Sequence, residues 1–210
     1  MMKYIVLGLL ALCAACGKSK SGPSPELKQL MAGNERYVSA QNGNEKDLAQ
    51  KRSATVTGQS PIAVIVGCSD SRVPPEIIFD QTLGDIFVVR VAGNVLGPLE
   101  MDSVEYAATQ LKCPLILILG HQSCAAVNAV LQGKAAENDL ENIVPYVQQA
   151  VDQAKNVPGD ALKNAICANV KLGMQRLEEN KLLKPLIKEG KLTIAGGYYA
   201  LDTGKVEIIP

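Results

Sequence analysis

Two short segments of the chain carry side chains that can bind a metal ion. In the first, Cys68 is followed by Asp70 and Arg72, and in the second, His121 is followed by Cys124. Two thiolates and one imidazole suit Zn²⁺, and three protein ligands leave the fourth position of a tetrahedral ion to water or substrate. The spacing therefore predicts a catalytic rather than a structural zinc site, unless Asp70 is itself the fourth ligand.

The same residues also have a plainer interpretation. A single cysteine beside a strand is usually a small buried hydrophobic residue, and a single histidine is more often hydrogen-bonded scaffolding than a metal ligand. His121 is the only histidine in the chain, and it stands three residues before Cys124. The coincidence of two such clusters, each at the end of an apolar run, favours the metal site.

Three nearly continuous apolar runs are typical of β-strands that are covered on both faces. They are residues 62–66, 86–91 and 115–119. The first run ends just before Cys68 and the third just before His121. Since open α/β sheets form their sites at the carboxyl ends of parallel strands, we expect the two ligand segments to meet there.

Helical patterns alternate with these runs, which indicates an α/β fold with a mostly parallel central sheet, one antiparallel edge strand and flanking helices. The polar segment after Ala40 is expected to be an exposed loop, and Asp160 is expected to cap a helix. The terminal runs 192–201 and 206–209 resemble a hairpin. The expected helices are 25–40, 101–111, one beginning near Cys124, 138–156 and 160–180.

Charge and composition exclude several classes of partner. Twenty-one Lys and Arg residues balance 21 Asp and Glu residues, and no run of like charge is present, so nothing predicts binding to nucleic acid. Hydrophobic residues make up 47% of the chain, enough for a sizeable core, whereas aromatic residues make up only 4%. A small-molecule partner fits this composition best.

The first residues have the features of an export signal. Lys3 precedes an apolar run that is too short to cross about 30 Å of hydrocarbon as a helix, so residues 1–15 are expected to be a signal peptide. Small residues before Cys16 resemble a bacterial lipobox, with Cys13 as a poorer alternative. We expect Cys16 to be lipidated, residues 16–25 to form a flexible tether, residues 26–210 to form the catalytic domain, and the protein to be anchored in the periplasm.

The two ligand segments also resemble the paired signatures of the β-class carbonic anhydrases, Cys-x-Asp-x-Arg and His-x-x-Cys. The likeness runs from about residue 26 to residue 209 and includes the segments 59–61, 87–90, 92–94 and 105–107. Either motif alone is weak, but the joint match is highly specific. The resemblance implies a zinc enzyme that reversibly hydrates carbon dioxide to bicarbonate and a proton by means of a zinc-bound hydroxide.

Roles for single residues follow from the resemblance. Cys68, His121 and Cys124 correspond to the zinc ligands, and Asp70 and Arg72 to the catalytic dyad. Asp70 is expected to accept a hydrogen bond from the nucleophile and align it, while Arg72 keeps the carboxylate ionised and oriented. In some family members the aspartate instead takes the fourth zinc position as an inactive state.

The resemblance also implies a substrate pocket at a subunit boundary. Gln59, Phe87 and Tyr106 match positions that line this pocket in the plant-type branch, so a homodimer or a higher homo-oligomer is expected. Ala92 stands where that pocket often has valine. Ala125 and Ala126 replace a Gly-Gly or Gly-Ala pair, and their methyl groups are expected to narrow the pocket or to shift a nearby backbone amide.

Two other functions remain open at this point. One is hydrolysis of carbon disulfide or carbonyl sulfide on the same scaffold, and the other is a non-catalytic zinc-binding or thiol-redox protein. Intact Asp70 and Arg72 argue against the second, because a pure binding module would not need them. The remaining cysteines, Cys113 and Cys167, are expected to be buried thiols rather than a disulfide.

Overall fold

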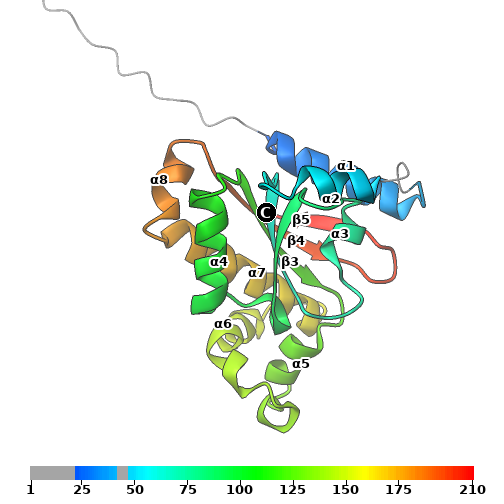
Figure 1. Cartoon of the computed structure of the whole chain (residues 1–210). Coiled ribbons are helices and arrows are strands. Elements are labelled where there is room, and N and C mark those ends of the chain that lie inside the picture. Colours follow the sequence, from blue (N-terminus) through cyan, green and yellow to red (C-terminus); the bar gives the residue numbers. More distant parts are fainter. Residues whose placement is uncertain (1–21, 42–46) are drawn as a thin grey trace, which may run out of the picture.

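A five-stranded sheet with the strand order β2-β1-β3-β4-β5 forms the centre of the protein (Figure 1). The computed structural model describes residues 22–41 and 47–210, so the expected signal peptide and Cys16 lie outside the described residues. Strands β1 to β4 run parallel to their neighbours, and β5 pairs with β4 in the antiparallel sense. The strands are β1 (Ala63–Gly67), β2 (Ile86–Arg90), β3 (Leu115–His121), β4 (Thr193–Tyr199) and β5 (Val206–Ile209).

Helices cover both faces of the sheet, with α4 and α7 on one side and α1 and α3 on the other (Figure 1). This arrangement confirms the predicted fold class. Every residue of β1 and of β3 is buried, as expected of parallel strands between two helical layers. The helices are α1 (Pro25–Val38), α2 (Leu48–Ala54), α3 (Pro75–Ile78), α4 (Pro98–Thr109), α5 (Ala125–Leu131), α6 (Val144–Ala154), α7 (Ala161–Glu179) and α8 (Leu183–Lys188), with 3-10 turns at Ala92–Asn94, Ala136–Asn138 and Glu141–Ile143.

The expectation of a loop after Ala40 is wrong for Leu48–Ala54, which form α2. The side chain of Asp47 caps this helix by accepting a hydrogen bond from the amide of Gln50, at 2.8 Å. No residue of α2 is buried. The helix therefore has no apolar stripe, and the hydrophobic period used to recognise helices cannot reveal it.

The helix predicted over 138–156 begins only at Val144. Asp139, with a φ of 54°, adopts the left-handed conformation, which interrupts any helix before that point. The helix predicted to begin at residue 101 instead begins at Pro98, because the fixed φ of proline suits the first turn. Asp160 caps α7 as expected, by accepting a hydrogen bond from the amide of Lys163.

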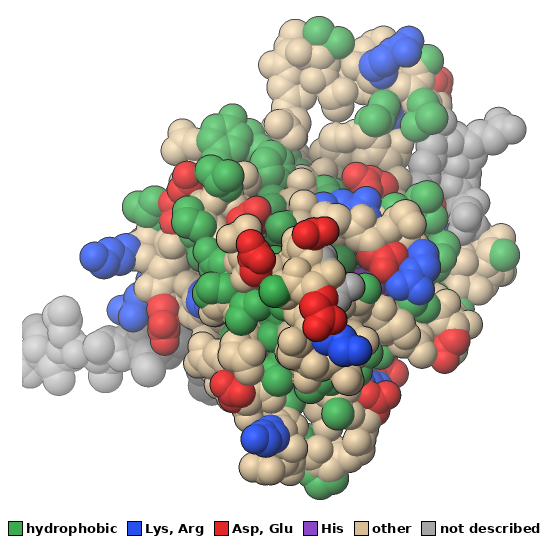
Figure 2. All heavy atoms as spheres, turned by 90° about the horizontal axis from the view of Figure 1, so that it is seen from below, with side chains coloured by type: hydrophobic (Ala, Val, Ile, Leu, Met, Phe, Trp, Pro, Cys, Tyr) green, Lys and Arg blue, Asp and Glu red, His purple; other side chains and the backbone are tan. Residues whose placement is uncertain are grey.

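Charged side chains of both signs lie on the same face of the molecule (Figure 2). On the face in Figure 2, acidic and basic side chains are interspersed with hydrophobic and neutral ones. Within residues 22–41 and 47–210, no helix has the length and apolar character needed to span a membrane.

Candidate metal centre

The sheet brings the two ligand segments together at its carboxyl edge. Strands β1 and β3 are adjacent and parallel, with Gly67 paired with Leu119. Cys68 directly follows β1, His121 is the last residue of β3, and Cys124 is the residue that caps α5. Each ligand is thus fixed by the end of a regular element.

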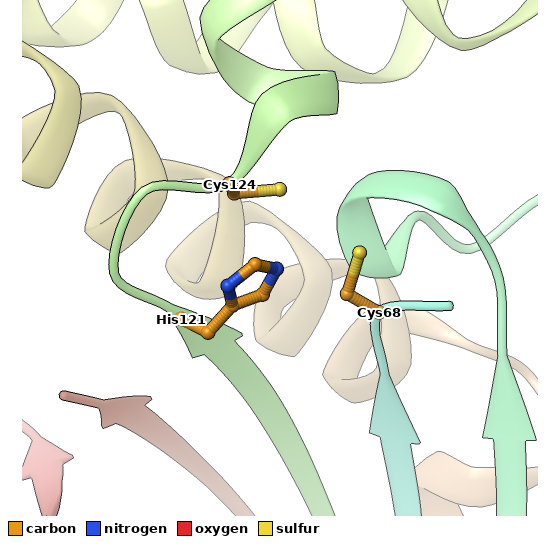
Figure 3. Close-up of side chains that lie close together, drawn as sticks. All are labelled: Cys68, His121 and Cys124. Carbon is orange, nitrogen blue, oxygen red and sulfur yellow. The ribbon is translucent and has the colours of Figure 1, made fainter. Parts of the chain in front are cut away.

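The three side chains converge on one point (Figure 3). Their ligand atoms, the two Sγ atoms and an imidazole nitrogen, all lie within 4.8 Å of one another. All three residues are buried, with His121 and Cys124 only 1% exposed. Two thiols and an imidazole at this spacing form a donor set for Zn²⁺ with three protein ligands.

His121 presents a free nitrogen to this point. Its Nδ1 lies 2.9 Å from the carbonyl oxygen of Gln122, and because a carbonyl only accepts, Nδ1 must be the donor. The proton on Nδ1 leaves the lone pair on Nε2, which is buried without a hydrogen-bond partner. A metal ion would satisfy this atom, and a histidine that binds a metal through one ring nitrogen usually donates the proton of the other to an acceptor such as this carbonyl.

Sequence reasoning missed the contribution of Gln122. Its side-chain Oε1 accepts hydrogen bonds from the backbone amides of Leu201 and Asp202, at 2.8 and 3.2 Å. The backbone amide of Gln122 donates to the carbonyl of Tyr199. The peptide that fixes the tautomer of His121 is therefore held by β4 and by the turn that follows it. No periodicity marks Gln122 in the sequence.

The two ligand thiols differ in acidity. Hydrogen bonds, first from the thiol of Cys124 and then from backbone amides, outweigh burial and lower the pKa of Cys68 to about 4. The same contact with Cys68, together with burial, raises the pKa of Cys124. The two thiols thus share one proton. Zinc binding would release this proton, because cysteine binds a metal as the thiolate.

A buried turn supports Cys68 from the side. The amide of Gly93 donates to Sγ of Cys68 at 3.4 Å, and the carbonyl of Gly93 accepts from Nδ2 of Asn169 in α7 at 2.8 Å. Gly93 has a φ of 69°, in the region that favours glycine. The methyl group of Ala126 lies 3.5 Å from where a β-carbon on Gly93 would stand. Ala126, one of the two alanines that depart from the family pattern, therefore packs against the turn. The amide of Gly93 still donates to Sγ of Cys68.

Asp70 and Arg72 form a bidentate ion pair beside the ligands. Nε and Nη2 of Arg72 donate to the two carboxylate oxygens of Asp70, at 2.9 and 2.7 Å, and the amide of Arg72 adds a bond of 3.0 Å. The Arg72 contacts hold the pKa of the Asp70 carboxyl well below its usual range, so Asp70 is ionised. Asp70 is not part of the three-residue ligand group among the described residues.

The structure does not bring all of the expected pocket residues to the metal ligands. Gln59 is exposed and precedes β1, and Phe87 is paired with Val64 near the beginning of that strand. Cys68 follows the other end of β1. Within one chain, Gln59 and Phe87 therefore lie toward the amino ends of the parallel strands, whereas the metal ligands lie at the carboxyl ends. Tyr106 lies on α4 and is 51% exposed.

The other two cysteines of the described residues take no part in the centre. Cys113 and Cys167 are free thiols, which confirms that they do not form a disulfide. Cys113 is buried, whereas Cys167 is only half-buried. The fold and the site together define an α/β protein with a catalytic type of zinc centre at the carboxyl edge of a parallel sheet.

Comparisons with known proteins narrow this class to a family. A family profile described as carbonic anhydrase matches residues 63–206. Carbonic anhydrase 2 of Mycobacterium tuberculosis is 37% identical over 88% of this chain and 92% of its own length, and a carbonic anhydrase of Mycolicibacterium smegmatis is 35% identical over 90% and 94%. A β-carbonic anhydrase of Coccomyxa, solved with acetazolamide, matches at a TM-score of 0.68 and 26% identity, over 89% of this chain and 87% of that chain.

The chain therefore belongs to the β-carbonic anhydrase family, whose members use zinc to interconvert carbon dioxide and bicarbonate. The resemblance noted in the sequence is confirmed, and so are the enzyme class and the zinc cofactor. The alternative activities, on carbon disulfide or as a non-catalytic thiol protein, find no support in these relatives.

Proposed function

We propose that this chain hydrates carbon dioxide with Cys68, His121 and Cys124 as its zinc ligands and with Asp70 and Arg72 as its catalytic dyad. The observation that carries the proposal is the unpartnered, buried Nε2 of His121 beside two cysteine sulfurs. A zinc ion at these ligands would supply a water molecule of lowered pKa as the nucleophile at neutral pH. The chain's own residues then hold and orient the reactants.

Asp70 is the residue that we assign to orienting the nucleophile. Its carboxylate is ionised and only 16% exposed, so it can accept a hydrogen bond from the attacking water and hold a lone pair toward carbon dioxide. Arg72 binds both oxygens of this carboxylate and prevents it from rotating freely. With no histidine beyond His121, the released proton must leave through solvent, buffer or Tyr106.

Stopped-flow carbon dioxide hydration by the zinc-loaded protein tests this proposal. Asp70→Ala should lower kcat by about 10²-fold while zinc occupancy stays complete, because the loss is one of orientation. Asp152→Ala, which removes an exposed carboxylate on α6, is the matched control and should leave the rate unchanged. A wild-type protein that is inactive at full zinc occupancy would refute the function, and equal rates for the Asp70 variant and the wild type would refute the role of Asp70.

We also propose that a second copy of the chain completes each substrate pocket. Gln59 and Phe87 lie away from the metal ligands of their own chain, and the solved β-carbonic anhydrases of Sordaria macrospora are described as tetrameric. Their TM-score of 0.64 at 22% identity supports a shared fold. In the proposed assembly, these two residues of one subunit face the zinc ligands of its partner.

A complementation experiment tests the shared pocket. Gln59→Ala and Cys68→Ser proteins should each be weakly active, whereas mixed oligomers of the two should regain activity, because one site of each pair then has both its ligands and its glutamine. Light scattering gives the oligomeric state. A monomer, or mixtures no more active than their parents, would contradict the proposal.

For localisation, we propose a periplasmic protein anchored through a lipid on Cys16. The support is the sequence alone: an apolar run after Lys3, small residues before Cys16 and a tether rich in Ser, Gly and Pro. Cys16→Ser should release the protein from membranes on fractionation, whereas Cys13→Ser should leave it bound. A Cys16→Ser protein that stays in the membrane fraction would show that the anchor is wrong.

A further inference from the structure

Arg90, the last residue of β2, reaches across to the loop that carries both Cys68 and Asp70. Its Nε donates to the carbonyl oxygen of Cys68 at 2.9 Å, and its Nη2 donates to the carbonyl oxygen of Asp70 at 2.6 Å. One side chain therefore holds the backbone of a zinc ligand and of the residue that we assign to the nucleophile.

The contact lies where the sheet stops. Strands β1 and β2 are paired up to Gly67 and Arg90, and two further backbone bonds join Val91 to Gly67 and to Ser69. The loop then leaves the sheet. Beyond the last paired residues, the guanidinium of Arg90 donates to the carbonyls of Cys68 and Asp70. Strand β2 therefore supports the loop as far as Asp70.

We propose that Arg90 is a positioning residue, which fixes the Cys68–Asp70 backbone so that the sulfur and the carboxylate are both held at the metal centre. The inference rests on the proposed function, because it gives Asp70 its task. Arg90 differs from Arg72 in what it contacts: Arg72 binds the carboxylate of Asp70, whereas Arg90 binds main-chain oxygens. A planar guanidinium with several fixed donors can bridge two carbonyls, which a lysine ammonium does less well.

The alternative is that Arg90 merely fastens the end of β2. A fastening role would appear as lower stability of the metal-free protein, with zinc affinity and kcat unchanged. A positioning role would lower both zinc affinity and kcat. Zinc affinity depends on the position of the Cys68 sulfur, and kcat depends on the position of the Asp70 carboxylate. Arg90 is exposed, so its replacement opens no buried cavity and the variants should fold.

The test compares Arg90→Met and Arg90→Lys with the wild-type protein. Zinc affinity is measured by competition with a chelator, kcat by stopped-flow hydration, and stability by thermal unfolding of the metal-free protein. Arg176→Met is the matched control, because Arg176 also donates to a main-chain carbonyl, that of Tyr146 at 3.3 Å, but joins α7 to α6.

We expect Arg90→Met to weaken zinc binding and to lower kcat, each by about tenfold, as the loss of a residue that holds a metal ligand in place does. Arg90→Lys should recover part of both losses, and Arg176→Met should change neither. Unchanged zinc affinity and kcat in Arg90→Met, with or without a lower melting temperature, would overturn the inference. An inactive wild-type protein would refute the proposed function, while the zinc affinities would still decide the role of Arg90.

Discussion

The cysteines show how environment sets the chemistry of identical side chains. Cys68 receives hydrogen bonds from the thiol of Cys124 and the amide of Gly93, and these contacts lower its pKa to about 4. Burial of Cys113 without such donors raises its pKa to about 11. The first thiol is prepared to bind a metal as a thiolate, and the second stays protonated as a packing residue.

This difference predicts the pH at which Cys113 reacts. Alkylation needs the thiolate, so in the zinc-loaded protein the rate at Cys113 should rise only toward pH 11, whereas in urea it should rise near the ordinary value of about 8.5. Modification at each cysteine is read by mass spectrometry. Cys167, which is half-buried, should react faster than Cys113 and serves as the internal control.

The raised pKa of Cys113 also makes the stability of the fold depend on pH. Because the folded state holds the thiol proton more tightly than the unfolded chain does, the contribution of this proton to the free energy of unfolding is fully present below about pH 8.5. The contribution is lost as the pH rises toward 11. Rapid alkylation of Cys113 at pH 8 in the folded protein would contradict this picture.

Among the elements, α1 makes hydrogen bonds to distant parts of the fold through one buried polar side chain, that of Asn34. Nδ2 of Asn34 donates to the carbonyls of Ile78 and Gly204, and its Oδ1 accepts from the amide of Val206 at 2.9 Å. Asn34 thereby joins the first helix to the end of α3 and to the beginning of β5, 172 residues away in the sequence. The N-terminal helix thus docks through directional bonds as well as through apolar packing.

A second contact links α1 to the strand beside the metal centre. The hydroxyl groups of Tyr37 and Tyr199 are 3.1 Å apart, and Tyr199 is the register partner of His121 on β4. The docking of α1 therefore supports the strand next to a zinc ligand.

Asn34→Ala should destabilise the protein by roughly 2–4 kcal/mol, because two buried hydrogen bonds and one part-buried hydrogen bond lose their partner at about 1 kcal/mol or more each. Denaturant unfolding measures the loss. Asn164→Ala is the control: its Nδ2 also bonds two carbonyls, of Val157 and Pro158, but at an exposed site, and its cost should be below about 1 kcal/mol. Equal losses for the two variants would show that Asn34 does not dock α1.

For the whole molecule, the metal centre joins parts of the chain that are far apart in sequence. Cys68 follows β1, while His121 and Cys124 lie at the end of β3 and the start of α5. A bound ion connects these elements in the folded state, whereas the unfolded chain does not hold the three ligands together. Zinc binding should therefore stabilise the whole fold.

Zinc at about 100 times its dissociation constant should add about 2.7 kcal/mol of stability, if the unfolded chain does not bind it. For a domain of this size, that free energy corresponds to a rise in melting temperature of roughly 5–10 °C. Calorimetry with and without a chelator measures the rise. The Cys124→Ser protein, which keeps the size of the side chain but loses a ligand, should show a smaller rise, and an equal rise would mean that zinc binds elsewhere.

Much of the fold and of the centre could be predicted from local patterns. The apolar runs predicted the parallel strands β1, β2 and β3, the positions of Cys68, His121 and Cys124 after two of them predicted the ligands, and Asp160 marked the start of α7. These features are local, because strand burial and helix capping depend on residues within a few positions of one another. α2, which buries no residue, gave no such signal.

By itself, the sequence determined the chemistry of the centre, because the ligand types and their spacing are written in two short segments. Only the tertiary structure decided what holds them in place. Arg90, Gln122 and Asn169 hold the loops of the site in place through hydrogen bonds that span 20 to 80 residues of sequence. Such contacts leave no periodic trace in the chain, because they depend on how the strands and helices pack and not on what lies next to each residue.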